Sequence, residues 1–265
     1  MKVGISTACL YPQEIECSLD HLLQLGFRDF EIFVNTISEI RPSFINYMRD
    51  MAQSQGGRIH SLHPFTSGYE SVMLFSTYMR RYEDSLEFYR RYFEAAARAD
   101  AKLVVLHGEK TWGKMPKLPM EEYCRRFQQL NEIGQEYGVV LAQENVSGFR
   151  SQDPEFLKEM RQMLGDGVKF VLDIKQSVRA GFTPDLILDA MGNNVIHIHV
   201  NDHTDVRDCM LPGRGNTDYQ ALKKRLDQIG YSGQWIIEVY RKDFDEEREL
   251  LDAAQHLEGI LNSHP

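Results

Sequence analysis

The sequence predicts a (β/α)8 barrel, an α/β fold in which eight parallel strands alternate with helices. Its 265 residues lie close to the ~250 typical of one such barrel. Short apolar runs of strand length alternate with longer amphipathic stretches, as in successive βα units. An open doubly wound sheet is disfavoured, because no Gly-x-Gly-x-x-Gly turn follows the first apolar run. We therefore expect one barrel domain over residues 1–265.

The apolar runs define the predicted strands and the amphipathic stretches define the predicted helices. The strands are Val3–Ala8, Asp29–Val34, Arg58–His63, Leu103–His107, Val139–Asn145, Lys169–Asp173, Val195–Asn201 and Gln234–Val239. The helices are Leu19–Leu25, Tyr82–Arg98, Met120–Tyr137, Pro154–Leu164, Pro184–Ala190, Tyr219–Ile229 and Glu246–Leu261. Helix starts are supported by Ser18 as an N-cap and by the Asp153-Pro154 and Thr183-Pro184 pairs, which combine an N-cap side chain with a first-turn proline.

Two long polar connections follow the third and fourth predicted strands, Thr66–Ser76 and Lys110–Pro119. Connections that follow the strands of a parallel barrel lie at its C-terminal mouth, where active sites of this fold are built. We expect both to cover that mouth. Glu31, near the end of the second strand, is expected in the wall of the same opening.

Composition is that of an ordinary globular protein, with 42% hydrophobic and 26% charged residues. No run approaches the ~18 apolar residues of a membrane span, and the opening residues lack the regions of a secretory signal. We therefore expect a cytoplasmic protein that does not enter a membrane. Cys9, Cys17, Cys124 and Cys209 form no Cys-x-x-Cys pair, so free thiols are expected rather than a zinc ribbon or a disulfide framework.

The charge balance disfavours nucleic acid as a partner. Asp and Glu number 39 against 30 Lys and Arg, which gives a formal net charge of −9. Such a surface repels a phosphodiester backbone over long range. We expect a small-molecule partner, while the sequence leaves the oligomeric state open, a homo-oligomer included.

Ionisable side chains follow apolar runs at the predicted mouth. Glu144, Asp173 and Glu238 come at the ends of the fifth, sixth and eighth strands, and His199 lies in the seventh. A carboxylate in apolar surroundings is costly unless it is paired or binds a metal. Three carboxylates aimed at one opening need a cation. With His199 they form an oxygen-rich set suited to Mn²⁺, Mg²⁺ or Co²⁺, and less well to Zn²⁺.

The alternative to a metal is an internal network of ion pairs. Lys175, Arg214 and Arg150 are the basic residues near these strand ends in the sequence. In that reading they would neutralise the carboxylates directly, and the cluster would be structural.

The sequence resembles the xylose isomerase-like barrels, a family that includes sugar and keto-sugar epimerases, hydroxypyruvate isomerase, inosose dehydratase and endonuclease IV. The resemblance extends from the Val-Gly-Ile-Ser opening to the glutamate of the eighth strand. It rests on short motifs in the order of the family, which are Glu144, Asp173, His199-x-Asn-Asp, Pro212-Gly213-x-Gly215-x-x-Asp218 and Glu238.

The resemblance implies a metal-dependent sugar isomerase or epimerase. Glu144, Asp173, His199 and Glu238 would hold one divalent ion, with Mn²⁺ expected first. Coordination of a ketose carbonyl and a neighbouring hydroxyl would acidify the adjacent C–H and hold the enediolate. Glu144 and Glu238 would be the catalytic residues, one removing the proton and the other returning it. Proton return to the opposite face gives epimerisation, and return to the neighbouring carbon gives isomerisation.

The resemblance implies that His63 and His107 either contact the sugar or sugar phosphate or hold hydrogen-bonded structural positions. Gln176 could bond a sugar hydroxyl, and Arg214, in the Gly-rich turn after the seventh strand, could reach a sugar oxygen or phosphate. At one of these positions the chain departs from the family, which has a histidine where Gln176 stands. Glutamine can bond a hydroxyl but cannot act as an acid, a base or a good metal ligand. Lys175 is equally unusual, and we expect it either to pair with the strand-six aspartate or to contact an anionic substrate.

Three other functions fit parts of this pattern. A lyase of the inosose dehydratase kind would use the same metal and base but expel a hydroxyl group. A nuclease of the endonuclease IV kind needs three metals, and Gln176 together with the Pro212–Asn216 turn removes ligands that this site requires. A metal-binding barrel without catalysis would keep the ligands and turn over no sugar.

Overall fold

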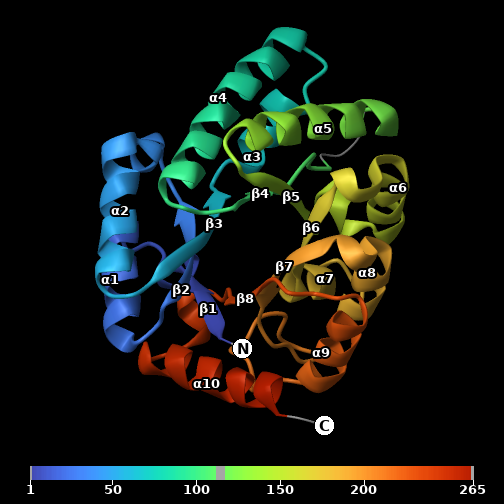
Figure 1. Ribbon diagram of the computed structural model, residues 1–265. Helices are drawn as coiled ribbons and strands as arrows, with labels where there is room; N and C mark the ends of the chain where they lie inside the picture. Colours follow the sequence, from blue (N-terminus) through green and yellow to red (C-terminus); the bar gives the residue numbers. More distant parts are fainter. Residues whose placement is uncertain (1, 112–116, 264–265) are drawn as a thin grey trace.

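The computed structural model describes residues 2–111 and 117–263, and its strands form one closed parallel barrel in chain order from β1 to β8 (Figure 1). β1 closes the ring by pairing with β8. The predicted (β/α)8 fold is therefore confirmed. The strands are β1 Val3–Ser6, β2 Asp29–Val34, β3 Arg58–Pro64, β4 Leu103–Leu106, β5 Val140–Glu144, β6 Lys169–Asp173, β7 Val195–Val200 and β8 Gln234–Ile237.

Helices surround the strands and bury them on the outside (Figure 1). They are α1 Ile15–Leu25, α2 Pro42–Ser54, α3 Ser67–Tyr69, α4 Met79–Arg98, α5 Met120–Glu136, α6 Pro154–Leu164, α7 Ile174–Arg179, α8 Pro184–Met191, α9 Tyr219–Gln228 and α10 Arg248–Asn262. Asp153 and Thr183 cap α6 and α8 with their side chains, as predicted. Ser18 does not cap α1, because that helix begins three residues earlier, at Ile15.

The polar connection Thr66–Ser76 is helical over most of its length. Residues Ser67–Tyr69 form α3, and a π-helical turn continues over Glu70–Leu74. Leu74 and Phe75 are buried, and the Phe75 ring stacks on Tyr123 of α5 with centroids 4.4 Å apart. Contacts with a distant helix, rather than a local periodic pattern, hold this segment in a helical form. Part of the other connection, residues 112–116, lies outside the described residues.

Two apolar regions lie on the two sides of the sheet. The larger one packs the outward strand side chains against the helices. A small one inside the barrel consists of Leu103, Val105, Ala142 and Val171. The inner layer also holds ionisable groups, because Glu31, His197 and His199 are buried and contact one another. Parallel strands of this kind are buried on both faces, so their sequences lack a clear alternation of polar and apolar residues. The sequence of such a strand therefore does not reveal which face carries the ionisable side chains.

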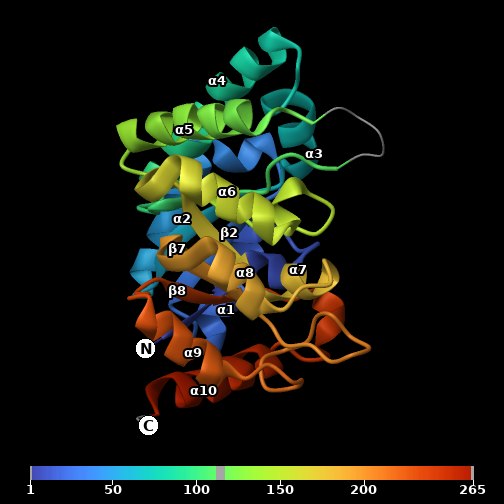
Figure 2. The same cartoon turned by 90° about the vertical axis from the view of Figure 1, so that its right-hand side faces the viewer.

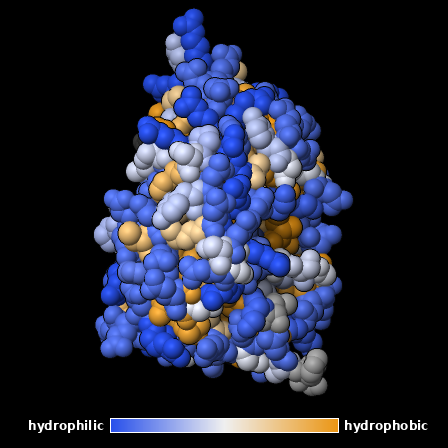
Figure 3. Space-filling view, turned by 60° about the vertical axis from the view of Figure 1, so that its left-hand side comes forward, coloured by the Kyte–Doolittle hydropathy of each residue, from blue (hydrophilic) through white to orange (hydrophobic). Residues whose placement is uncertain are grey.

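The C-terminal ends of the strands form one mouth. In Figure 2, α3 and α7 lie on the side of the barrel away from both chain termini. These short helices directly follow β3 and β6 and so mark the C-terminal side. No helix in the described ranges is both long and apolar enough for a membrane crossing. The face in Figure 3 is mostly hydrophilic, with apolar side chains in small separate groups.

The turn after β7 is held by a single carboxylate. Asp202 accepts hydrogen bonds from the backbone N–H groups of Gly213, Gly215, Thr217 and His203 at 2.9–3.0 Å. Gly215 has no room for a Cβ atom, which would come within 2.3 Å of the His203 carbonyl oxygen. The Gly-rich motif is therefore required by the packing of this turn against the strand end.

We predict that Asp202→Asn lowers the free energy of unfolding by about 1–3 kcal/mol, because an amide offers only one acceptor oxygen and leaves partly buried N–H donors unpaired. Urea denaturation followed by circular dichroism measures this. Asp205→Asn, on the exposed part of the same loop, is the control and should change stability by less than about 0.5 kcal/mol. Equal stability of both variants would show that the turn does not depend on Asp202.

Candidate metal centre

Four residues from four strands meet at the mouth. Glu144 and Asp173 are the last residues of β5 and β6, His199 lies in β7, and Glu238 directly follows β8. One potential ligand atom of each lies within 4.8 Å of the others. All four are buried, with Glu238 the most exposed at 7%. The structure thus brings together the four residues that the sequence singled out as metal ligands.

His199 stands at the centre of this group. Its Nδ1 lies 3.0 Å from Glu144 Oε1, 3.3 Å from Glu238 Oε2 and 3.6 Å from Asp173 Oδ2. One imidazole nitrogen therefore faces all three carboxylates. A cation bound at this nitrogen would have carboxylate oxygens from three strands within reach.

The opposite nitrogen of His199 is held by Glu31. His199 Nε2 lies 3.2 Å from Glu31 Oε2, which also accepts a hydrogen bond from Ser61 Oγ and lies 3.2 Å from His197 Nε2. A carboxylate at Nε2 favours the tautomer that carries its proton there, which leaves the Nδ1 lone pair for a metal. Glu31 is the third of six residues in β2 rather than near its end, and its buried side chain contacts both His199 and His63 of this site.

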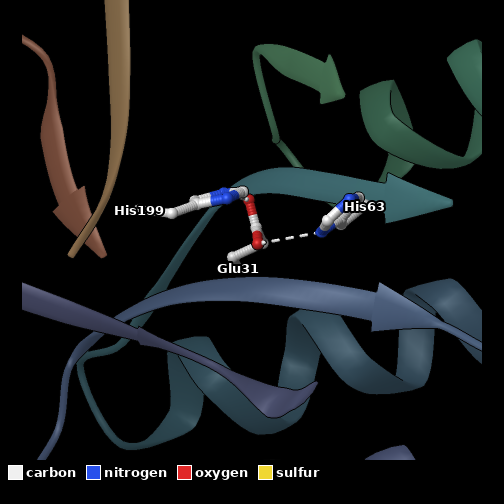
Figure 4. Close-up of side chains that lie close together, drawn as sticks. All are labelled: Glu31, His63 and His199. Carbon is white, nitrogen blue, oxygen red and sulfur yellow. Dashed lines mark hydrogen bonds and ion pairs between the residues drawn. The ribbon is translucent and has the colours of Figure 1, made fainter. Parts of the chain in front are cut away.

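A second histidine, His63, lies between Glu144 and Glu238 and also contacts Glu31. The Nδ1 atom of His63 lies 3.5 Å from Glu238 Oε1 and 3.5 Å from Glu31 Oε1. Its Nε2 atom lies 3.7 Å from Glu144 Oε2. Figure 4 shows Glu31 between His63 and His199. Each glutamate therefore directs one oxygen toward His199 and the other toward His63.

His107 and Glu70 extend this arrangement. His107 Nε2 lies 3.0 Å from His63 Nε2, and the two rings stack with centroids 4.8 Å apart. On its other side His107 Nδ1 lies 3.2 Å from Glu70 Oε1. Glu70 also accepts hydrogen bonds from Gly108 N and Tyr89 Oη. No residue pattern indicated this role in advance, because Glu70 lies within the polar connection Thr66–Ser76 rather than at the end of a predicted strand.

The charged groups stabilise one another against the cost of burial. Burial opposes the charged form of His63, but Glu238, Glu31 and Glu144 outweigh it and raise the pKa of His63 to about 10. Burial likewise opposes the imidazolium of His199, yet Glu31, Glu238, Asp173 and Glu144 raise its pKa well above the usual value. Both imidazoles thus favour the protonated form, whose positive charge compensates the carboxylates.

Lys175, the second residue of α7, adds a further positive charge. Its Nζ lies 2.7 Å from Asp173 Oδ2 and forms a second ion pair with Glu238 Oε2. Burial works against the ammonium, but the two carboxylates raise the pKa of Lys175 well above its ordinary value. Burial would raise the pKa of Glu238, yet Lys175 and the two histidines hold that pKa well below its usual range.

The alternative to a metal was an ion-pair network of the carboxylates with Lys175, Arg214 and Arg150. Of these three basic residues, Lys175 pairs with the carboxylates of the set. Arg150 pairs with Glu109, and Arg214 pairs with Glu249 of α10. The Arg214 side chain is 48% exposed. The structure therefore does not bring Arg214 into contact with the four-residue set.

Gln176 contacts the four-residue set through a hydrogen bond to Asp173. Its backbone N–H donates to Asp173 Oδ1 at 3.0 Å, which makes Asp173 the N-cap of α7. Its side-chain oxygen accepts a hydrogen bond from Ser147 N at 3.1 Å. Of the four predicted substrate contacts, His63 and His107 touch the set directly and Gln176 adjoins it.

The donor set fits a divalent ion in type and spacing. Three carboxylates and one imidazole form an oxygen-rich environment of the kind that Mn²⁺ and Mg²⁺ accept. Asp173 Oδ2, Glu144 Oε1, Glu238 Oε2 and His199 Nδ1 all face the same point. The Lys175 ammonium contacts two of these oxygens. These residues could thus hold a metal, provided that Lys175 yields its contacts.

A model of the family described as xylose isomerase-like TIM barrel matches residues 19–260. The chain belongs to the xylose isomerase-like TIM barrel family. An uncharacterised protein of Methanocaldococcus jannaschii is 24% identical over 98% of this chain and 89% of its own length. An uncharacterised protein of Mycobacterium leprae is 23% identical over 90% of this chain and 89% of its own length.

Solved structures of other proteins have the same fold. A D-tagatose 3-epimerase-like protein superposes with a TM-score of 0.78 at 22% identity, over 98% of this chain and 97% of its own. D-psicose 3-epimerase of Clostridium cellulolyticum H10, solved with D-tagatose, gives 0.79 at 17% identity over 98% of both chains. The IOLI protein, solved with a bound zinc atom, gives 0.76 at 19% identity, again over 98% of both chains.

We predict that Glu31→Gln weakens Mn²⁺ binding by about 10- to 100-fold, because it removes the carboxylate that orients His199. Isothermal titration of metal-stripped protein with MnCl₂ measures the change. Glu83→Gln, an exposed glutamate of α4, serves as the control for loss of one negative charge. If Glu31→Gln folds and binds Mn²⁺ like the control, Glu31 does not orient the ligand.

Proposed function

We propose that this chain is a divalent-metal-dependent isomerase or epimerase of a sugar, keto-sugar or sugar phosphate. The observation that carries the proposal is the pair of buried glutamates, Glu144 and Glu238, each of which has an oxygen within 3.3 Å of His199 Nδ1. Membership of the xylose isomerase-like family supports it. Further support comes from solved structures of the same fold that are described as a D-tagatose 3-epimerase-like protein and a D-psicose 3-epimerase.

Each glutamate has one oxygen for the cation and one for a proton. Glu144 Oε1 and Glu238 Oε2 face His199, whereas Glu144 Oε2 and Glu238 Oε1 face the two nitrogens of His63 at 3.5–3.7 Å. The second pair of oxygens is therefore the one proposed to exchange protons with a substrate carbon. His63 would keep both of these oxygens in fixed orientations.

The residues then divide the proton transfer between them. One glutamate removes the proton next to the substrate carbonyl, and the other returns a proton to the opposite face or to the neighbouring carbon. Glu238 is ionised at neutral pH, because its pKa is held low, and so can start as an acceptor. When bound, the divalent ion supplies positive charge to substrate oxygens as negative charge develops.

We predict that the chain exchanges a ketose C–H proton with solvent, and that Glu144→Gln and Glu238→Gln each slow the exchange by about 10²- to 10⁴-fold. A panel of ketoses and sugar phosphates is incubated in D₂O, and mass spectrometry and NMR identify the labelled carbon. Glu159→Gln, exposed on α6, is the matched control. Exchange at the wild-type rate in both site variants would exclude the glutamates as the acid and base.

We predict that chelation abolishes this exchange and that added Mn²⁺ restores it, because the ion is proposed to stabilise the charge that develops on the substrate. Rates after addition of Mn²⁺, Mg²⁺, Co²⁺ or Zn²⁺ to the stripped protein rank the ions. Undiminished exchange in protein shown by elemental analysis to be free of metal would contradict metal dependence.

A further inference from the structure

The Lys175 ammonium lies where a metal would be expected to bind. It bonds Asp173 Oδ2 at 2.7 Å and pairs with Glu238 Oε2. Both oxygens also face His199 Nδ1, at 3.6 and 3.3 Å. The side chain is 3% exposed. A buried lysine with two carboxylate partners is a strong counter-charge, since removal of either partner leaves charge uncompensated in a medium of low dielectric constant.

The alternative carboxylate oxygens are already engaged. Asp173 Oδ1 accepts the Gln176 backbone N–H that caps α7, at 3.0 Å. Glu238 Oε1 lies 3.5 Å from His63 Nδ1. The oxygens that Asp173 and Glu238 direct toward His199 Nδ1 are therefore the ones that Lys175 holds. An ammonium and a divalent ion at adjacent positions on the same two oxygens repel each other strongly.

We propose that the Lys175 ammonium is a built-in competitor of the divalent ion at Asp173 and Glu238. The inference rests on the proposed metal site and adds a property of this chain, namely that metal binding requires displacement of a resident cation. The protein consequently binds its metal more weakly and releases it more readily than the same four ligands would without Lys175.

The surroundings of Lys175 offer the displaced ammonium another position. Its Nζ lies 5.8 Å from the centre of the Tyr240 ring, which is partly exposed just after β8. A ring face attracts a cation. Movement toward Tyr240 would separate the ammonium from the two metal-binding oxygens, although it would bring it closer to Arg179 and Lys242, which also lie over this ring at 5.1 and 5.6 Å.

Metal affinity of variants tests this directly. Metal-stripped wild type, Lys175→Met and Lys175→Gln are titrated with MnCl₂ by calorimetry at one fixed pH, after circular dichroism has confirmed folding. The glutamine variant keeps a polar side chain, should the methionine variant fail to fold. Lys169→Met removes the same charge from the opposite end of β6 and is the control.

We expect both Lys175 variants to bind one Mn²⁺ at least about tenfold more tightly than wild type and the control. Equal or weaker binding by the folded variants, with a wild type that binds Mn²⁺, would overturn the competition and leave the proposed function intact. Absence of binding in wild type and in both variants would overturn the competition together with the proposed metal dependence. If the Lys175 variants bind Mn²⁺ and the wild type does not, the result would support competition strong enough to prevent metal binding under these conditions.

Discussion

The contact between one imidazole nitrogen and three carboxylates is the constraint on which the site depends. His199 Nδ1 lies within 3.6 Å of oxygens from Glu144, Asp173 and Glu238. Such a cluster is stable in a buried position only with compensating positive charge. Protonated histidines and Lys175 provide that charge in the protein alone, and a divalent ion provides it in the proposed active form.

The surrounding residues fix this contact from several directions. Glu31 holds the far nitrogen of His199. Asn145 joins the ends of two ligand-bearing strands, because its side chain accepts from Asp173 N at 2.7 Å and donates to Asp173 O at 2.9 Å. Glu70 anchors His107 from the segment between β3 and α4. The geometry of the site thus comes from side chains on or directly after several strands, and from the helical connection that follows β3.

The sequence predicted the barrel and the four central residues because both depend on local patterns. An apolar run followed by a carboxylate indicates the end of a buried strand, and parallel strands bring such ends together. Lys175 was expected to meet either the strand-six aspartate or a substrate, and the structure shows the first of these contacts. Its pairing with Glu238 depends on strands that are far apart in the sequence.

Other contacts could not be predicted from local patterns. Glu31 lies between the buried residues Phe30 and Ile32, so alternation along the strand does not show that its side chain points to the inner layer. Glu70 lies in a segment without helical periodicity, which long-range packing makes helical. Arg214 was placed near the substrate by its position in a Gly-rich turn, but its partner Glu249 comes from the last helix.

The most direct test of the metal centre is a crystal structure of the protein grown with Mn²⁺, with anomalous scattering recorded on both sides of the manganese absorption edge. The account predicts one strong anomalous peak at about 2.0–2.3 Å from one ligand atom of each of Glu144, Asp173, His199 and Glu238, with the Lys175 ammonium moved away from Asp173. A fully folded protein without a peak at these residues, and with Lys175 still between Asp173 and Glu238, would contradict it.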